Sequence, residues 1–117
     1  MTTLIVCIRR RPGMTPQEFS SYWRERHGPL IQACPDFKRH LASYVQYHLI
    51  DGNSDIAKMF GVSGEYDGVA VLRFHDENAL RQAFNEPAYL EMVRPDEPNF
   101  VDLDHSMSFI AEPAVMV

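Results

Sequence analysis

The sequence predicts a single α+β domain built from two β-α-β units, and three observations carry this prediction. Short runs rich in Val and Ile alternate with segments of helical spacing. The helical segments begin with capping residues, and glycine and proline separate the elements. A chain of 117 residues with 45% apolar residues has the size and composition of one ordinary domain, so we treat residues 1–117 as one unit.

The first unit opens with a strand and continues with a helix. Residues 3–9 form a nearly continuous apolar run, which is typical of a strand covered on both faces. Thr15 and Glu18 have the spacing of a capping box, in which the threonine oxygen accepts a backbone N–H and the glutamate reaches back. With Pro16 at the first helical position, we expect a helix to begin there, and we expect Gly28-Pro29 to stop or kink it.

The strand that closes the first unit is expected over residues 40–50. Strand alternation places Tyr44, Gln46 and His48 on one face and Tyr47 on the other. Neither face is plainly a solvent face, and only one of the two sets can point into a ligand-binding lumen. The alternation alone leaves that choice open.

The second unit repeats this order after a long segment that contains several glycines. Residues 51–66 are expected to form a loop with a single helical turn, and residues 67–75 a third strand. Asp76 is expected to cap a second helix that runs through Phe84. Pro87 is expected to interrupt that helix.

The end of the chain is expected to be irregular up to its last strand. Residues 89–93 are expected to add a short helical turn before a break at residues 95–98, which begins and ends with proline. A last strand is expected over residues 107–116. Pro113 within it indicates a bulge or an edge position.

The order β-α-β-β-α-β is that of the ferredoxin-like fold, a four-stranded antiparallel sheet with both helices on one face. The other face of the sheet would then be bare, although the predicted strands are apolar on both sides. Monomers rarely expose so large an apolar patch. We therefore expect a homodimer in which two sheets pack face to face and form a dimeric α/β barrel.

Composition and charge argue against several classes of protein. A formal net charge of −5 argues against a nucleic-acid partner, and the one basic run, Arg9 to Arg11, is more simply a solvated strand end. No apolar stretch approaches the ~20 residues that span a bilayer, so no membrane partner is expected. Cys7 and Cys34 have neither a metal spacing nor a disulfide framework, which favours reduced thiols and a cytoplasmic location.

Several stretches of the sequence together resemble one known family. They are the segment from Arg9 to Phe19, the residues Tyr22-Trp23 and His27-Gly28-Pro29, and the later run Tyr66-Asp67-Gly68-Val69-Ala70 with Phe74, Phe84 and Pro87 after it. These motifs are similar to the signature of the EthD family and keep its order of elements over nearly the whole chain. The resemblance implies a dimeric α/β barrel. It also implies a range of functions, from dehydratases or decarboxylases of aromatic polyketides to proteins that accompany oxygenase systems.

His27 is the strongest candidate for a catalytic residue. It ends the first predicted helix four residues after Trp23, where the helix dipole and an aromatic wall would suit a general acid or base. The resemblance also includes this histidine, and a histidine that only caps the helix is the alternative. Asp67 is the second catalytic candidate: it would orient His27 or take a proton, or it would simply begin a strand.

Two groups of residues are candidates for binding a substrate. Tyr22 and Trp23 would line a pocket for a planar ring, although aromatic pairs at helical spacing are more often part of a core. Tyr44, Gln46 and His48 would bind a hydroxylated compound if their polar ends face a cavity. If they do not, they would line a dimer interface.

These candidates favour a cofactor-independent enzyme that acts on a hydroxylated aromatic or polyketide-like compound, with His27 moving a proton during dehydration, decarboxylation or isomerisation. One alternative is a non-catalytic protein that binds a small hydrophobic or aromatic ligand or assists an oxygenase system. A cofactor-free monooxygenase and a purely structural dimer are the others. No cofactor and no metal are expected, because the Asp102–His105 run stands alone and the sequence has no nucleotide-binding motif.

Overall fold

Four strands form one antiparallel sheet with the spatial order β2-β3-β1-β4. In chain order they are β1 (Thr2–Ile8), β2 (Leu41–His48), β3 (Gly68–Phe74) and β4 (Met107–Ala111). This arrangement confirms the predicted ferredoxin-like α+β fold. The computed structural model describes it over residues 1–50, 54–61 and 65–117.

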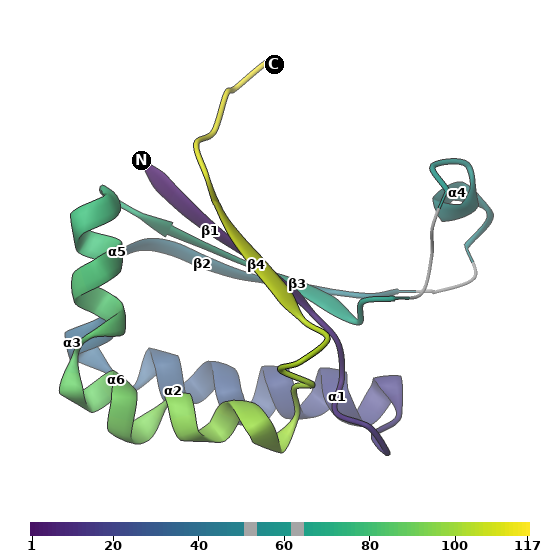
Figure 1. Cartoon of the computed structure of the whole chain (residues 1–117), viewed down its shortest axis with the longest axis horizontal. Helices are drawn as coiled ribbons and strands as arrows, with labels where there is room; N and C mark the ends of the chain where they lie inside the picture. Colours follow the sequence, from purple (N-terminus) through teal and green to yellow (C-terminus); the bar gives the residue numbers. More distant parts are fainter. Residues whose placement is uncertain (51–53, 62–64) are drawn as a thin grey trace.

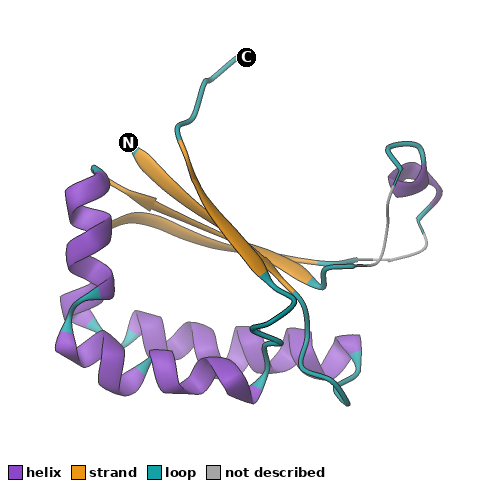
Figure 2. Ribbon diagram, in the orientation of Figure 1, coloured by secondary structure: helices purple, strands orange, loops and turns teal. Residues whose placement is uncertain are grey.

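The helices that follow β1 and β3 lie together on one side of the sheet, and the opposite side is uncovered in the described part of the chain (Figures 1 and 2). These helices are α1 (Pro16–Tyr22), η1 (Trp23–His27), α2 (Gly28–Gln32), α3 (Pro35–Lys38), α5 (Glu77–Phe84), α6 (Pro87–Met92) and η2 (Arg94–Asn99). None of the described helices is long and apolar enough to cross a membrane.

A single short helix, α4 (Asp55–Lys58), projects beyond the ends of β2 and β3 (Figure 1). It is the helical turn expected within residues 51–66. The parts of that expected loop at residues 51–53 and 62–64 lie outside the described residues.

The first helix begins as predicted and continues further than a simple stop at Gly28-Pro29 would allow. Thr15 Oγ1 accepts the Glu18 N–H at 3.1 Å, and Glu18 Oε1 accepts the Thr15 N–H at 3.0 Å, which completes the capping box. At η1 the helix widens to a π-turn, in which the Gly28 N–H bonds to the carbonyl of Trp23. The wide turn accommodates Pro29, which has no N–H to offer, and the chain passes into α2.

Two segments near the C-terminus differ from the prediction. β4 ends at Ala111 instead of residue 116, because Pro113 cannot donate to a strand ladder. The expected break at residues 95–98 is the 3-10 helix η2. Its tighter turn tolerates Pro95 near its start, where a backbone N–H has no helical partner in any case.

The core lies between the sheet and the helices, and it is aromatic. The side chains that are almost fully buried there include Phe19, Trp23, Phe37, Phe74 and Phe100. The sheet makes room for the largest of them at a glycine: a Cβ on Gly68 would lie 2.5 Å from the Trp23 ring. The glycine of the Asp67-Gly68 motif therefore allows the indole to lie directly on the backbone of β3.

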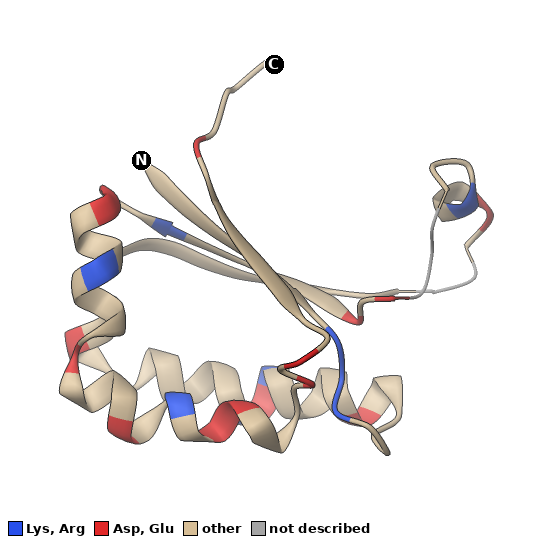
Figure 3. Cartoon of the chain, in the orientation of Figure 1, with Lys and Arg blue, Asp and Glu red and all other residues tan. Residues whose placement is uncertain are grey.

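The uncovered face of the sheet is largely apolar. The strand register places two apolar rows on it, namely Val45, Val71, Ile5 and Phe109, and beside them Tyr47, Val69, Cys7 and Met107. A third row on the same face, Ser43, Arg73, Thr3 and Ala111, is more polar. Within the four strands, Arg73 is the single Lys, Arg, Asp or Glu, and the other charges lie on helices and loops (Figure 3). The bare apolar face predicted from the sequence is therefore present.

Candidate active site

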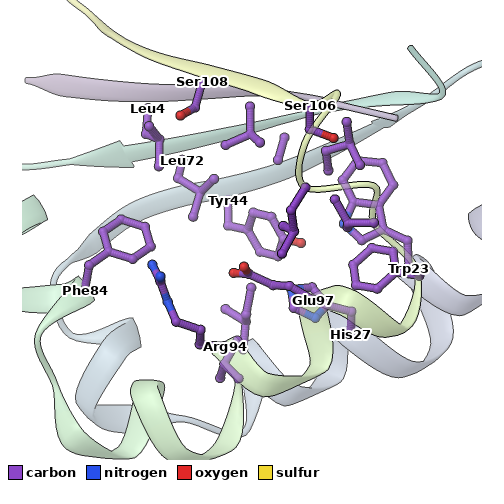
Figure 4. A pocket seen from close by; sticks show the side chains of 18 of the residues that line it. Leu4, Trp23, His27, Tyr44, Leu72, Phe84, Arg94, Glu97, Ser106 and Ser108 are labelled. Atoms are coloured by element: carbon purple, nitrogen blue, oxygen red, sulfur yellow. The ribbon is translucent and has the colours of Figure 1, made fainter. Parts of the chain in front are cut away.

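A cavity of about 290 Å³ lies between the sheet and the helix layer. All four strands contribute to its lining, through residues such as Leu4, Tyr44, Leu72 and Ser108. The opposite wall includes aromatic and charged side chains of η1 and η2 (Figure 4). Because a cavity of ~150 Å³ in another protein accepts benzene, this one has room for a compound of about two fused rings.

His27 lies on the wall of this cavity at the end of η1, and the residue is 7% exposed. Its Nδ1 lies 3.0 Å from Oδ2 of Asp96, and its ring packs against Phe100 with the ring centres 4.8 Å apart. An ionised carboxylate can only accept, so Nδ1 carries the proton in this pair. In the neutral ring, Nε2 is then the basic nitrogen.

Asp96 is held as an anion by its hydrogen bonds. The Tyr22 hydroxyl donates to Oδ1 at 2.5 Å, and the Asn99 amide donates to the same oxygen at 3.1 Å. Burial alone would raise the pKa of Asp96, but the bonds from Tyr22, Asn99 and His27 outweigh it and lower the pKa. Burial and the adjacent Asp96 raise the pKa of Tyr22, so its hydroxyl keeps the proton that it donates.

Two more charged side chains, Arg94 and Glu97, point into the cavity from η2 (Figure 4). Glu97 Oε1 accepts the Tyr89 hydroxyl at 3.1 Å, and the Arg94 guanidinium lies 5.7 Å from the centre of the Tyr89 ring. Burial, and then the charge of Glu97, raise the pKa of Tyr89, so this tyrosine is a neutral donor. The cavity is thus largely apolar but carries ionisable groups on one wall.

The polar residues of β2 face the helices and form one connected chain. Ser20 Oγ lies 2.7 Å from Nδ1 of His48, and His48 Nε2 lies 2.9 Å from Oε1 of Gln46. The Gln46 amide donates to the Trp23 carbonyl at 3.0 Å and to the Tyr44 hydroxyl at 2.8 Å. Of the three predicted β2 residues, Tyr44 lines the cavity, whereas Gln46 and His48 lie behind it.

The adjacent aromatic residues Tyr22, at the end of α1, and Trp23, at the start of η1, have different roles. Trp23 is 1% exposed and also contributes to the cavity wall, so it is both core and lining. Tyr22 does not belong to the lining, and its hydroxyl binds Asp96 instead. Tyr22 therefore contacts the cavity wall indirectly, through the Asp96–His27 pair and through its stacking on Phe100, with the ring centres 5.3 Å apart.

Three residues of this site escape prediction from the sequence: Arg94, Asp96 and Glu97, all in η2. The one available signal is an acidic pair between two prolines, directly before the buried Phe100. The described residues, those of this site included, contain no group of three or more His, Cys, Asp or Glu side chains placed to hold a metal ion.

Comparison with known proteins identifies the family. Residues 11–104, most of the chain, match the model of the EthD domain. The chain belongs to the EthD family. A conidial pigment biosynthesis dehydratase EthD from Metarhizium robertsii is 23% identical over 111 residues, which cover 88% of this chain and 75% of the relative.

Solved structures share the fold of this EthD chain. An EthD-family protein from Bacillus halodurans C-125 aligns with a TM-score of 0.68 at 16% identity, over 97% of this chain and 100% of its own. A dimeric protein of unknown function with a ferredoxin-like fold, from Bacteroides fragilis, gives 0.65 at 10% identity, over 95% and 94%. SnoaB, a cofactor-independent oxygenase from Streptomyces nogalater, gives 0.61 at 16% identity, over 99% and 95%.

In this EthD chain Asp67 does not form the expected contact with His27. Its Oδ1 accepts the Arg10 guanidinium at 2.7 Å, and its Oδ2 accepts the Arg10 backbone N–H at 2.8 Å. The same guanidinium donates to the Met14 carbonyl at 2.8 Å. Through Arg10, Asp67 therefore stabilises the loop before α1. The expectation for Asp67 is therefore wrong: Asp96, and not Asp67, is the carboxylate that binds Nδ1 of His27 and orients its ring.

Proposed function

We propose that this chain is a cofactor-independent enzyme that moves a proton on a hydroxylated aromatic or polyketide-like compound, with His27 as the group that takes and returns the proton. The observation that carries this proposal is that His27 lines a largely apolar cavity and is paired with an anionic Asp96. A carboxylate on Nδ1 leaves Nε2 basic and stabilises the imidazolium that forms when Nε2 accepts a proton.

Dehydration of a β-hydroxy ketone fused to an aromatic ring fits these groups. His27 Nε2 takes a proton from the carbon beside the carbonyl, and the electrons of that C–H bond become a C=C bond. The hydroxyl group on the next carbon leaves with the proton from the imidazolium as water, so His27 returns to its neutral form. No oxidant or reductant is consumed, and decarboxylation or isomerisation would use the same residue.

Two further observations support this reaction class. The relative from Metarhizium robertsii is named as a dehydratase of pigment biosynthesis. The cavity volume of about 290 Å³ suits a bicyclic compound.

The test is the dehydration of 3-hydroxy-1-tetralone, which yields 1-naphthol with a distinct ultraviolet spectrum. Wild type is expected to accelerate the reaction, and His27→Ala is expected to lose about 10²- to 10⁴-fold of that acceleration, the usual contribution of a general acid or base. Equal rates for the two proteins would remove His27 from the mechanism.

A cofactor-independent oxygenase is the second candidate, and the likeness to SnoaB supports it. In that reaction His27 would deprotonate a hydroxylated aromatic so that the resulting anion reacts with oxygen. Oxygen uptake in the presence of a dihydroxynaphthalene, at a rate that depends on His27, would favour this candidate over dehydration.

For the assembly, the proposal is a homodimer in which a second copy covers the bare face of the sheet. Apolar rows such as that of Val71, Ile5 and Phe109 cross this face, and Phe109 is 46% exposed. The structural neighbour from Bacteroides fragilis is described as dimeric and has the same fold. Burial of an apolar face of this kind favours association of two copies.

A further inference from the structure

The hydroxyl of Tyr44 lies at the end of a chain of hydrogen bonds that fixes its role. The Gln46 side-chain nitrogen lies 3.0 Å from the backbone carbonyl oxygen of Trp23. A carbonyl oxygen only accepts, so the amide must present its NH₂ group here. The other hydrogen of this NH₂ group points to the Tyr44 hydroxyl oxygen at 2.8 Å.

His48 supports the same orientation of Gln46. The amide oxygen of Gln46 lies 2.9 Å from Nε2 of His48, and Nδ1 lies 2.7 Å from the Ser20 hydroxyl. Burial, and then the charge of Arg24, lower the pKa of His48, so the ring is neutral at pH 7. A neutral ring that accepts from Ser20 at Nδ1 carries its proton on Nε2 and donates it to Gln46.

The Tyr44 oxygen is therefore an acceptor in this series of hydrogen bonds. The hydroxyl proton is left for a different partner. Burial raises the pKa of Tyr44 in spite of opposing hydrogen bonds from Gln46 and Trp23, so the hydroxyl keeps that proton. Tyr44 lines the cavity, and its ring reaches into the same hollow as His27 (Figure 4).

We propose that the Tyr44 hydroxyl donates a hydrogen bond to a carbonyl oxygen of the ligand, and that Gln46 and His48 are positioning residues that keep Tyr44 a donor. The ligand class is thereby narrowed to aromatic compounds that present a ketone oxygen to the β2 side of the cavity. The choice of an aromatic ligand in this inference rests on the proposed function. When His27 removes a proton beside the ketone, negative charge builds on that oxygen, and a donor already directed at it stabilises the charge.

The test compares the binding of two probes of the same shape, 1-tetralone and tetralin, which differ by the ketone oxygen. Dissociation constants are measured by calorimetry for wild type, Tyr44→Phe and Gln46→Glu, each as the intact protein and without turnover. Wild type is expected to prefer 1-tetralone by about tenfold, which is the contribution of one hydrogen bond. Tyr44→Phe is expected to lose this preference while its affinity for tetralin stays the same.

Gln46→Glu tests the positioning role, because a carboxylate at this place accepts the Tyr44 proton and turns the donor away from the ligand. It is expected to lose the preference although Tyr44 is intact, a result that a merely structural Gln46 would not produce. If this variant does not fold, Gln46→Met removes the amide and is expected to reduce the preference. The tetralin affinity again reports whether the cavity is preserved.

The outcomes separate this inference from the proposed reaction. Equal binding of the two probes by wild type, binding of neither, or a preference retained in Tyr44→Phe would overturn the role of Tyr44, even if dehydration depends on His27. A preference that depends on Tyr44 supports the inference, even if wild type dehydrates none of the compounds tested.

Discussion

Nδ1 of His27 lies 3.0 Å from Oδ2 of Asp96, although the two residues are 69 positions apart in the chain. The other oxygen of the same carboxylate holds the Tyr22 hydroxyl. The 3-10 helix η2 thus brings an anion to the end of the π-turn η1 and fixes which nitrogen of His27 is basic.

The first prediction concerns Asp96. Asp96→Asn is expected to lower turnover by roughly a hundredfold or more, because an amide does not stabilise the imidazolium and lets Nδ1 lose its proton. Asp67→Asn is the matched control: it weakens the Arg10 contact, is expected to cost about 1–3 kcal/mol of unfolding free energy, and leaves turnover intact. A larger loss of turnover in the Asp67 variant would contradict this assignment.

The second prediction is a pH dependence of stability that comes from Asp96. Its pKa in the folded state is lowered from 3.8, so its ionised form stabilises the folded state above pH 3.8. This stabilisation is lost as the pH falls through the lowered pKa. The melting temperatures of wild type and Asp96→Asn are therefore expected to differ at pH 7 and to converge as the pH falls below 3.8. A constant difference in differential scanning fluorimetry would speak against this contribution.

The third prediction concerns the close approach of Trp23 to Gly68. Gly68→Ala places a methyl group 2.5 Å from a rigid, buried indole, so it is expected to cost about 1–3 kcal/mol, or roughly 4 °C in melting temperature per kcal/mol. Trp23→Phe removes the atoms that clash. In a double-mutant cycle the two changes are expected to cost clearly less together than the sum of their separate costs, and simple additivity would refute the contact.

The fourth prediction concerns the homodimer. Phe109 and Ile110 are neighbours on β4 with similar exposure, 46% and 55%, but they point to opposite sides of the sheet. Phe109→Glu places a charge on the bare face and is expected to yield monomers at micromolar concentration in sedimentation velocity. Ile110→Glu is expected to stay dimeric. A wild-type protein that sediments as a monomer would end the proposal.

The fold could be predicted because each element carries a local signal. The capping box of Thr15 and Glu18 and the apolar runs of the strands depend only on neighbouring residues. The order of these elements then leaves few topologies to choose from. The strand end at Ala111 differs from the prediction because apolar residues follow Pro113, and a proline is compatible with an edge strand such as β4, so it does not by itself mark the end of the strand.

The site could be predicted only in part. His27 stands out by its place at the end of a helix, but its partner depends on a contact between distant segments, and a short 3-10 helix with two prolines has no periodicity to reveal it. A place at the start of a strand makes Asp67 a candidate partner of His27, yet the structure joins it to Arg10. Gln46 and His48 share a face with Tyr44 as alternation predicts, although they do not line the cavity.

The most direct measurement of the central claim follows the exchange of the protons beside the carbonyl of 1-tetralone in D₂O by NMR. Acceleration over the protein-free rate requires that a group on the protein remove a proton and return a deuteron, and this readout does not depend on the identity of the natural substrate. Wild type and Asp67→Asn are expected to accelerate exchange, whereas His27→Ala and Asp96→Asn are expected to lose most of the effect. Absence of acceleration by wild type, or equal acceleration by His27→Ala, would contradict the role of His27 as the proton-transfer residue.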